Sequence, residues 1–310
     1  MIGIPEGLAR GTVAREGEPG RAWIAALPGL VEALLDQWGC RPDGAPTHGQ
    51  VGLVLPVRGA DGAPAVLKVS FPHPGNVHEP DAYAAWGGRG AVRLHRRDDD
   101  RLAMLLERAD AHTLADHPDV DEAVAVAGRL TRTLAVAAPP GLPRLSEQAG
   151  PWADDLRRDA DRLPRPLPRR VVDAAIATLR ELGPDQPDTL VHGDLHFGNV
   201  LRAGREPWLA IDPKGHVGDP AYDGLTLLRT RVEDLLAAAD PHRALLRRLA
   251  IYAEAAELDP ERVRRWAQVR AVTAAHWGRR HGDPHWLLEL TDRTAQLLSR
   301  SPARPAAAPN

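Results

Sequence analysis

Two short segments of the chain gather side chains that could do chemistry. They are LVHGDLHFGNVL, residues 190–201, and LAIDPKG, residues 209–215. Their chemically versatile members are His192, Asp194, His196, Asn199, Asp212 and Lys214. Imidazoles and carboxylates can bind a metal ion that activates water, whereas carboxylates with an amide and an ammonium can hold Mg²⁺ and phosphate groups. The two segments therefore predict either metal-dependent hydrolysis or phosphoryl transfer.

Hydrolysis would use the histidines as metal ligands. In an extended segment, the two histidines and Asp194 would alternate onto one face, and such a set can bind Zn²⁺ or Fe²⁺. The next candidate ligands, Asp212 and His216, follow at no recognisable ligand spacing. Asn199 would also have no role. A metal-dependent hydrolase therefore stays as a remote alternative.

Phosphoryl transfer explains more of the same residues. The spacing H-G-D-L-x-x-x-N matches the catalytic loop of kinases, with Gly193 where protein kinases carry arginine. The reaction needs a carboxylate near the attacking hydroxyl and Mg²⁺ bridging the phosphates of ATP. In this interpretation Asp194 is the catalytic residue that receives or orients the acceptor hydroxyl, and Asn199 and Asp212 bind Mg²⁺.

The lysine content points to the residues that would bind ATP. Of 39 basic residues, only Lys68 and Lys214 are lysines, and arginine does not replace a compact ammonium at every site. Lys68 lies in AVLKV, close to the V-A-I-K pattern of kinases, and is expected to bind the α- and β-phosphates. Glu79 is the best-placed helix carboxylate to pair with it, and Lys214 could reach a phosphate. Without such a role, Lys68 would be a solvent-facing residue at a strand edge, and Glu79 a helix N-terminal acid favoured by the dipole.

Four further features have smaller expected roles. The backbone from Glu107 to Ala109 is expected to bind the adenine edge, and the glycine-bearing turn at residues 48–52 to cover the nucleotide. We expect His192 to bond the backbone near the catalytic loop. Gly218-Asp219-Pro220 and Asp223 are expected to cap the following helix rather than to touch substrate.

The elements that must position these residues divide into a β-rich first part and a helical second part. Apolar runs on either side of an Asp-Gly turn predict a β-hairpin over residues 48–70. Further strands are predicted at 91–94 and 102–107, and short strands or loops at 189–201 and 207–212. Apolar residues at helical spacing predict helices over 23–39, 79–86, 119–137, 170–182, 221–239, 242–257, 260–280 and 284–299. We therefore expect a nucleotide-binding lobe over residues 1–108, a catalytic and substrate lobe over 109–300, and a disordered tail over 301–310.

The bulk composition limits the partners. The chain has 310 residues, of which 43% are apolar, and a formal net charge of −3, which gives no electrostatic footprint for nucleic acid. No apolar run approaches the roughly 20 residues of a membrane span, and the N-terminus lacks the apolar core of a secretory signal. Cys40 is the one cysteine, which excludes a disulfide framework. We expect a cytoplasmic monomer whose partner is a small molecule, without nucleic-acid or membrane partners.

At these residues the chain resembles the aminoglycoside phosphotransferase family. VHGDLHFGNVL, AIDPKG and GDPAYD stand as the catalytic and metal motifs of that family do. GRAWIAALPGLVEALLDQWG, AVLKV, HEPDAYAAWGGRGAVRL and LLERA are similar to the branch that contains streptomycin 6-phosphotransferases and hydroxyurea-resistance kinases. The resemblance covers roughly residues 20–225 and weakens after residue 230, where most acceptor contacts would lie.

The resemblance implies a bilobal, protein-kinase-like α+β fold with a small β-rich N-lobe and a larger, mostly helical C-lobe. It also implies that Asp194 is the catalytic base, that Asn199 and Asp212 bind magnesium, and that Lys68 binds ATP with Glu79 as its partner. The expected activity is ATP- and Mg²⁺-dependent phosphorylation of a hydroxyl on a small antibiotic, with streptomycin as the expected acceptor. The alternatives are another small acceptor, such as hydroxyurea or a metabolite, and a nucleotide-binding pseudoenzyme.

Overall fold

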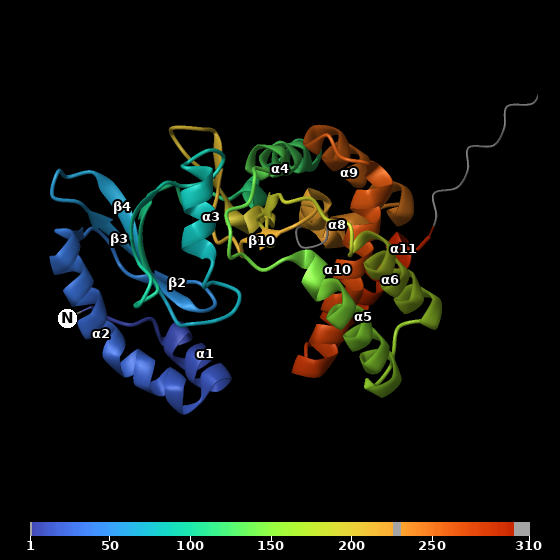
Figure 1. Ribbon diagram of the computed structural model, residues 1–310, viewed down its shortest axis with the longest axis horizontal. Coiled ribbons are helices and arrows are strands. Elements are labelled where there is room, and N and C mark those ends of the chain that lie inside the picture. Colours follow the sequence, from blue (N-terminus) through green and yellow to red (C-terminus); the bar gives the residue numbers. More distant parts are fainter. Residues whose placement is uncertain (1, 226–230, 301–310) are drawn as a thin grey trace, which may run out of the picture. The chain divides into compact units, whose positions relative to one another are not determined.

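The computed structural model describes residues 2–225 and 231–300, and the chain forms two units (Figure 1). The first unit contains Met1–Ala111 and Ala203–Lys214, and the second contains His112–Arg202 and Gly215–Asn310. The predicted disordered tail, residues 301–310, lies outside the described residues. Within the described part of the chain, no helix is long and apolar enough to cross a membrane.

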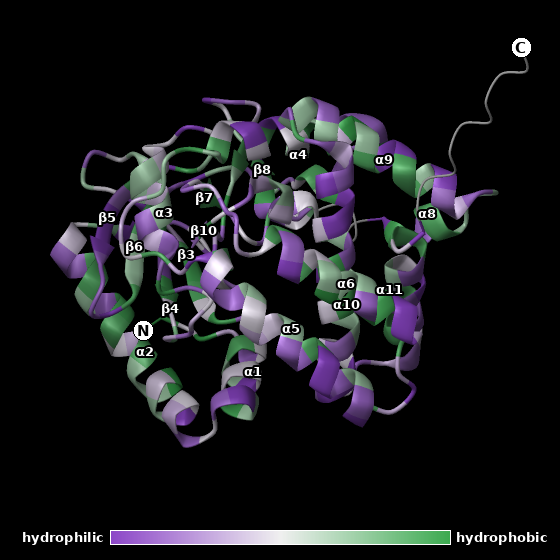
Figure 2. Ribbon diagram, turned by 45° about the vertical axis from the view of Figure 1, so that its right-hand side comes forward, coloured by the Kyte–Doolittle hydropathy of each residue, from purple (hydrophilic) through white to green (hydrophobic). Residues whose placement is uncertain are grey.

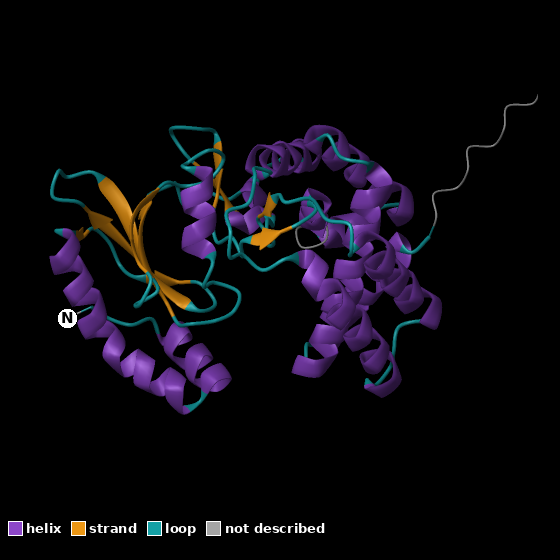
Figure 3. Ribbon diagram, viewed as in Figure 1, coloured by secondary structure: helices purple, strands orange, loops and turns teal. Residues whose placement is uncertain are grey.

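An antiparallel sheet with a central hairpin forms the middle of the first unit (Figure 3). Its strands are β1 (Arg41–Pro42), β2 (Thr47–His48), β3 (Gly52–Arg58), β4 (Pro64–Ser70), β5 (Leu94–Asp98) and β6 (Ala103–Glu107). The order is β1-β3-β4-β6-β5, and β2 also pairs with β3. In this register Lys68 of β4 lies opposite Val54 of β3 and Met104 of β6. Lys68 is therefore in a central strand, which overturns the alternative of a lysine at a strand edge.

Helices cover the apolar side of this sheet. They are α1 (Glu6–Glu16) and α2 (Glu18–Trp38), while α3 (Glu79–Trp86) and the short strand β9 (Trp208–Ala210) complete the unit. The core contains an apolar stripe of α2 and alternate residues of β3 and β4, namely Leu27, Val31, Leu34, Leu35, Trp38, Leu53, Leu55, Val57, Leu67 and Val69. Because side chains alternate across a strand, Leu67 and Val69 point into this core and Lys68 points to the opposite face of the sheet.

Amphipathic helices make up most of the second unit. They are α4 (Val120–Leu134), α5 (Leu145–Arg162), α6 (Arg169–Leu182), α8 (Val232–Leu236), α9 (Pro241–Ala256), α10 (Pro260–His281) and α11 (His285–Leu298). Figure 2 shows hydrophilic and hydrophobic residues alternating along α4 and α9, as expected for helices with one buried face. Asp119, Asp240 and Asp259 cap α4, α9 and α10 by accepting backbone N–H bonds. The short elements are β7 (Leu190–Val191), β8 (Val200–Arg202), β10 (His216–Val217) and the 3₁₀ turns η1 (Leu114–Asp116), η2 (Phe197–Asn199) and η3 (Pro220–Leu225).

Most predicted elements are confirmed within a few residues, but three predictions are wrong or incomplete. The strand predicted at 91–94 lies at Leu94–Asp98. A single helix was predicted over 221–239, but the described residues of this range form the 3₁₀ turn η3 and the short helix α8. Residues 226–230 lie outside the described residues. The helices α1 and α5 were not predicted, because glycines interrupt α1 and Gly150-Pro151 interrupts the apolar period of α5.

Candidate active site

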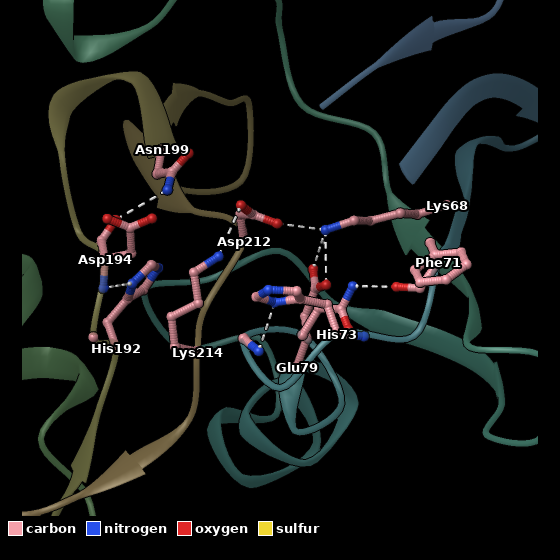
Figure 4. Close-up of polar contacts among 12 residues, drawn as sticks. Lys68, Phe71, His73, Glu79, His192, Asp194, Asn199, Asp212 and Lys214 are labelled. Carbon is pink, nitrogen blue, oxygen red and sulfur yellow. Dashed lines mark hydrogen bonds and ion pairs between the residues drawn. The ribbon is translucent and has the colours of Figure 1, made fainter. Parts of the chain in front are cut away.

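Lys68 binds two carboxylates within the first unit (Figure 4). Its Nζ lies 2.6 and 2.7 Å from the two carboxylate oxygens of Glu79, and 2.5 Å from Oδ1 of Asp212. The three side chains come from β4, from the first residue of α3 and from the segment that follows β9. The side chain of Glu79 is 1% exposed, so the first residue of α3 carries a buried carboxylate that is paired with Lys68. The predicted pairing of Lys68 with Glu79 is present in the structure.

The loop before α3 holds Glu79 in place. Buried Asn76 donates from Nδ2 to the carbonyl of Phe71 at 2.9 Å and accepts the N–H of His73 at 3.1 Å. The carbonyl of Asn76 in turn accepts the N–H of Glu79 at 3.1 Å. The sequence analysis did not assign Asn76 a role. Its rarity was the available signal, since the chain has only three asparagines.

Asp212 has an uncommon backbone conformation. Its φ of 61° lies in the left-handed region, which costs a residue with a side chain on the order of 1–3 kcal/mol. The N–H of Asp212 donates to the hydroxyl of buried Tyr83 at 2.9 Å, and this bond helps to hold the conformation. Lys214 lies 3.3 Å from Oδ2 of Asp212. The carboxylate of Asp212 therefore lies between two ammonium groups.

The pKa values follow from this arrangement. Burial by itself would lower the pKa of Lys68, but the charges of Glu79 and Asp212 outweigh it and raise that pKa. Burial would raise the pKa of Asp212, but Lys68 and Lys214 hold that pKa well below its usual range. Burial raises the pKa of Glu79, and Lys68 offsets this only in part. At neutral pH the site therefore holds a fixed ammonium at Lys68 and a fixed carboxylate at Asp212.

Asp194 and Asn199 lie together in the second unit, on the loop that follows β7 (Figure 4). Nδ2 of Asn199 donates to the backbone carbonyl of Asp194 at 2.9 Å, and the turn η2 brings the two residues within reach. The N–H of Asp194 donates to Nδ1 of His192 at 3.2 Å. His192 is fully buried, so its expected role of bonding the backbone of the loop is confirmed. Since this bond occupies Nδ1, that ring nitrogen does not serve as a metal ligand.

Asp223 has a role that the sequence analysis missed. Its carboxylate accepts the backbone N–H of His192 at 3.0 Å and that of Gly193 at 2.7 Å. Burial raises the pKa of Asp223 to about 7, although these N–H groups favour the charged form. The expectation that Asp223 caps the following helix is wrong, because its side chain reaches back to the catalytic loop. The same expectation is confirmed for Asp219, which accepts the N–H of Ala221 at 2.9 Å.

Glu107 and Ala109 lie at the end of β6 and in the segment after it. The side chain of Glu107 binds Arg205 at 2.9 Å and accepts the N–H of Arg93 at 3.0 Å. This carboxylate therefore supports the strand end, and the predicted contact with adenine would have to come from the backbone. That contact stays a prediction.

Each unit, taken by itself, carries donor atoms of a kind that magnesium or phosphate groups bind. Mg²⁺ prefers oxygen ligands, and it usually binds one or two carboxylates together with substrate phosphates. Asp212 supplies a carboxylate that stays charged. Since the amide nitrogen of Asn199 is bonded to Asp194, the amide oxygen is the atom left to bind a cation. Lys68 and Lys214 add the positive charge that phosphate groups need.

Comparison with known proteins identifies the family. The family model described as "Aminoglycoside/hydroxyurea antibiotic resistance kinase" matches residues 37–282. The chain is 42% identical to streptomycin 6-kinase of Streptomyces glaucescens over 279 residues, which cover 89% of this chain and 91% of that protein. The chain belongs to the aminoglycoside/hydroxyurea antibiotic resistance kinase family.

Two further relatives agree with this assignment. The kinase is 38% identical to hydroxyurea phosphotransferase of Kitasatospora aureofaciens over 281 residues, which cover 89% of this chain and 80% of that protein. It also matches the structure of an aminoglycoside phosphotransferase in a ternary complex with AMP-PNP and hygromycin B, with a TM-score of 0.58 and 14% identity over 90% of this chain and 99% of that one. At that identity the match concerns the fold alone, and it confirms the predicted protein-kinase-like α+β class. The predicted phosphotransferase class is confirmed by the family.

Proposed function

We propose that this kinase transfers the γ-phosphoryl group of ATP to a hydroxyl of streptomycin, and so acts in antibiotic resistance. The observation that carries the chemistry is the bonding of Lys68 to both Glu79 and Asp212, because a buried lysine with two carboxylates is the part of a kinase that binds phosphates and metal together. The 42% identity to a streptomycin 6-kinase supports the choice of acceptor.

In this proposal each residue of the site has one task. Asp194 accepts the proton of the attacking hydroxyl, and the bond from Asn199 to its carbonyl keeps its backbone in place. Lys68 binds phosphate oxygens of ATP, and Glu79 keeps its ammonium in position. Lys214 would bind a further phosphate oxygen.

Magnesium, when bound, would neutralise the phosphate charge that develops during transfer. We propose Asp212 and Asn199 as its protein ligands, one through a charged carboxylate and the other through a neutral amide oxygen. The backbone from Glu107 to Ala109 would bind the adenine edge. Use of ATP would make the cytoplasm the site of the reaction.

A second acceptor is favoured by a specific observation. The kinase shares 38% identity with a hydroxyurea phosphotransferase, which is close to its identity with the streptomycin enzyme. Hydroxyurea is much smaller than streptomycin and has an N-hydroxyl group. The position of the base and the phosphate-binding residues would serve either acceptor, so the choice depends on contacts to the rest of the molecule.

The test is ADP release by the purified protein with ATP and Mg²⁺, in the presence of streptomycin, another aminoglycoside, hydroxyurea or no acceptor. Streptomycin-dependent release, with a phosphorylated product by mass spectrometry, is the expected result, and Asp194→Asn serves as the inactive control. ADP release with hydroxyurea as the only active acceptor would show that the protein is a kinase but that streptomycin is not its acceptor. Binding of ATP without turnover on any acceptor would indicate a pseudoenzyme and contradict the proposal.

A further inference from the structure

A residue of helix α10 binds the peptide group that precedes the proposed base. Gly193 donates its N–H to Asp223, and its carbonyl accepts a bond from Nη2 of Arg270 on α10 at 3.2 Å. The carbonyl of Gly193 belongs to the peptide bond that joins Gly193 to Asp194. Arg270 therefore helps to orient the peptide bond between Gly193 and Asp194.

Arg270 is itself held in a defined position. Its guanidinium carbon lies 4.1 Å from the centre of the Tyr222 ring, which is a cation–π contact. Tyr222 is buried, and its ring stacks on Trp152 at a centroid distance of 5.9 Å and packs edge-on against Trp266 at 5.6 Å. A flat guanidinium can lie on an aromatic ring and donate sideways at the same time, whereas an ammonium cannot. The contact therefore favours arginine at this position.

Gly193 has a backbone conformation that favours glycine. Protein kinases carry an arginine at this place in the catalytic loop, but here φ is 85°, a region that side-chain-bearing residues rarely adopt. The guanidinium that binds the carbonyl of Gly193 belongs to a residue 77 positions later in the chain. Its charge also favours the ionised form of Asp223, the other group that holds the loop.

We propose that Arg270 is the positioning residue of the catalytic loop, and that it fixes the Gly193–Asp194 peptide so that the carboxylate of Asp194 meets the acceptor hydroxyl. This inference rests on the proposed role of Asp194 as the base. Arg270 does not contact the nucleotide in this proposal, so its loss should affect kcat and leave the KM for ATP unchanged.

The test compares Arg270→Met with Arg265→Met. Arg265 lies on the same helix and bonds Glu181 at 2.6 Å and Thr178 at 3.2 Å, so its loss removes an arginine of α10 that has no link to the loop. Arg270→Met should lower kcat by about 100-fold, the order expected for a base displaced by about 1 Å, with the KM for ATP changed less than about 2-fold. Arg265→Met should keep the wild-type kcat.

Chemical rescue separates positioning from a loss of folding. Added guanidinium ion at low millimolar concentration should restore part of the kcat of Arg270→Ala, and ammonium ion should not. If Arg270→Met does not fold, Arg270→Lys decides: a fall in kcat of about 10-fold or more, at unchanged KM for ATP, is expected because lysine lacks the planar fork. A wild-type kcat in any folded Arg270 variant, or equal loss of kcat in Arg265→Met, would overturn the proposal. If the acceptor-dependent turnover of the wild-type protein survives Asp194→Asn, the proposed role of Asp194 is wrong. If Asp194→Asn is inactive and Arg270→Met keeps the wild-type kcat, only the proposed role of Arg270 is wrong.

Discussion

Replacing Lys68 with methionine tests the buried ion pair directly. The change removes the ammonium that both carboxylate oxygens of Glu79 bind at 2.6 and 2.7 Å, and it leaves a side chain of similar length. Removing one partner of a buried pair costs about 3–5 kcal/mol, because the other charge stays buried without compensation. The side chain of Asp212 is 38% exposed and keeps Lys214 at 3.3 Å, so most of the cost falls on Glu79.

The cost should depend on pH, since Glu79 can avoid it by binding a proton. Burial already raises the pKa of Glu79 above its usual value of 4.5, and loss of Lys68 would raise that pKa further. A carboxyl group whose pKa is higher in the folded state stabilises the fold fully below its unfolded pKa, and this contribution is lost as the pH rises through the folded pKa. The destabilisation of Lys68→Met relative to wild type should therefore be small near pH 5 and approach about 3–5 kcal/mol by about pH 8.

Urea unfolding at about pH 5 and pH 8 measures this difference in the free energy of unfolding. The matched control is the double variant Lys68→Met with Glu79→Gln, which removes both charges and keeps the shapes. At pH 8 the double variant should be more stable than Lys68→Met alone, and its stability should change less between the two pH values. A pH-independent loss in Lys68→Met, with no recovery in the double variant, would refute the reasoning that Glu79 depends on Lys68.

Three further predictions concern the reaction and the loop. Asp194→Asn should lower kcat by about 10²–10⁴-fold, the usual contribution of a general base, and leave the ATP affinity measured by calorimetry unchanged; retained turnover would exclude Asp194 as the base. Asp223→Asn should lower kcat, because an amide can accept only one of the two N–H bonds to the loop. The same change should flatten the pH dependence of unfolding: the folded-state pKa of Asp223 is about 7, so wild-type protein should lose stability as the pH rises from about 4 to about 7, and an unchanged slope in urea titrations would contradict this. Removal of divalent cations with EDTA should abolish phosphorylation, and added Mg²⁺ should restore it; phosphorylation that survives EDTA would contradict a requirement for Mg²⁺.

Sequence patterns correctly predicted the elements whose boundaries are set by residues adjacent in the chain. The hairpin of β3 and β4 follows from alternating apolar residues around Asp61-Gly62, and the start of α10 follows from Asp259-Pro260. Patterns failed where tertiary contacts outweigh local preference. The helix α5 forms despite Pro151 in its interior, and it packs against α6.

The sequence by itself determined the chemistry, since the side chains of Lys68, Glu79, Asp194, Asn199 and Asp212 occur in short motifs whose residue types already imply phosphoryl transfer. It also predicted the pairing of Lys68 with Glu79, which lie 11 residues apart. Only the tertiary structure revealed how the loop around Asp194 is held.

Asp223 and Arg270 bind backbone atoms of Gly193, although they follow it in the chain by 30 and 77 residues. A backbone N–H or carbonyl is the same at every position, so no pattern of side chains marks which distant residue will bind it. That choice is made when η3 and α10 pack beside the loop and bring a carboxylate and a guanidinium to the two sides of one glycine.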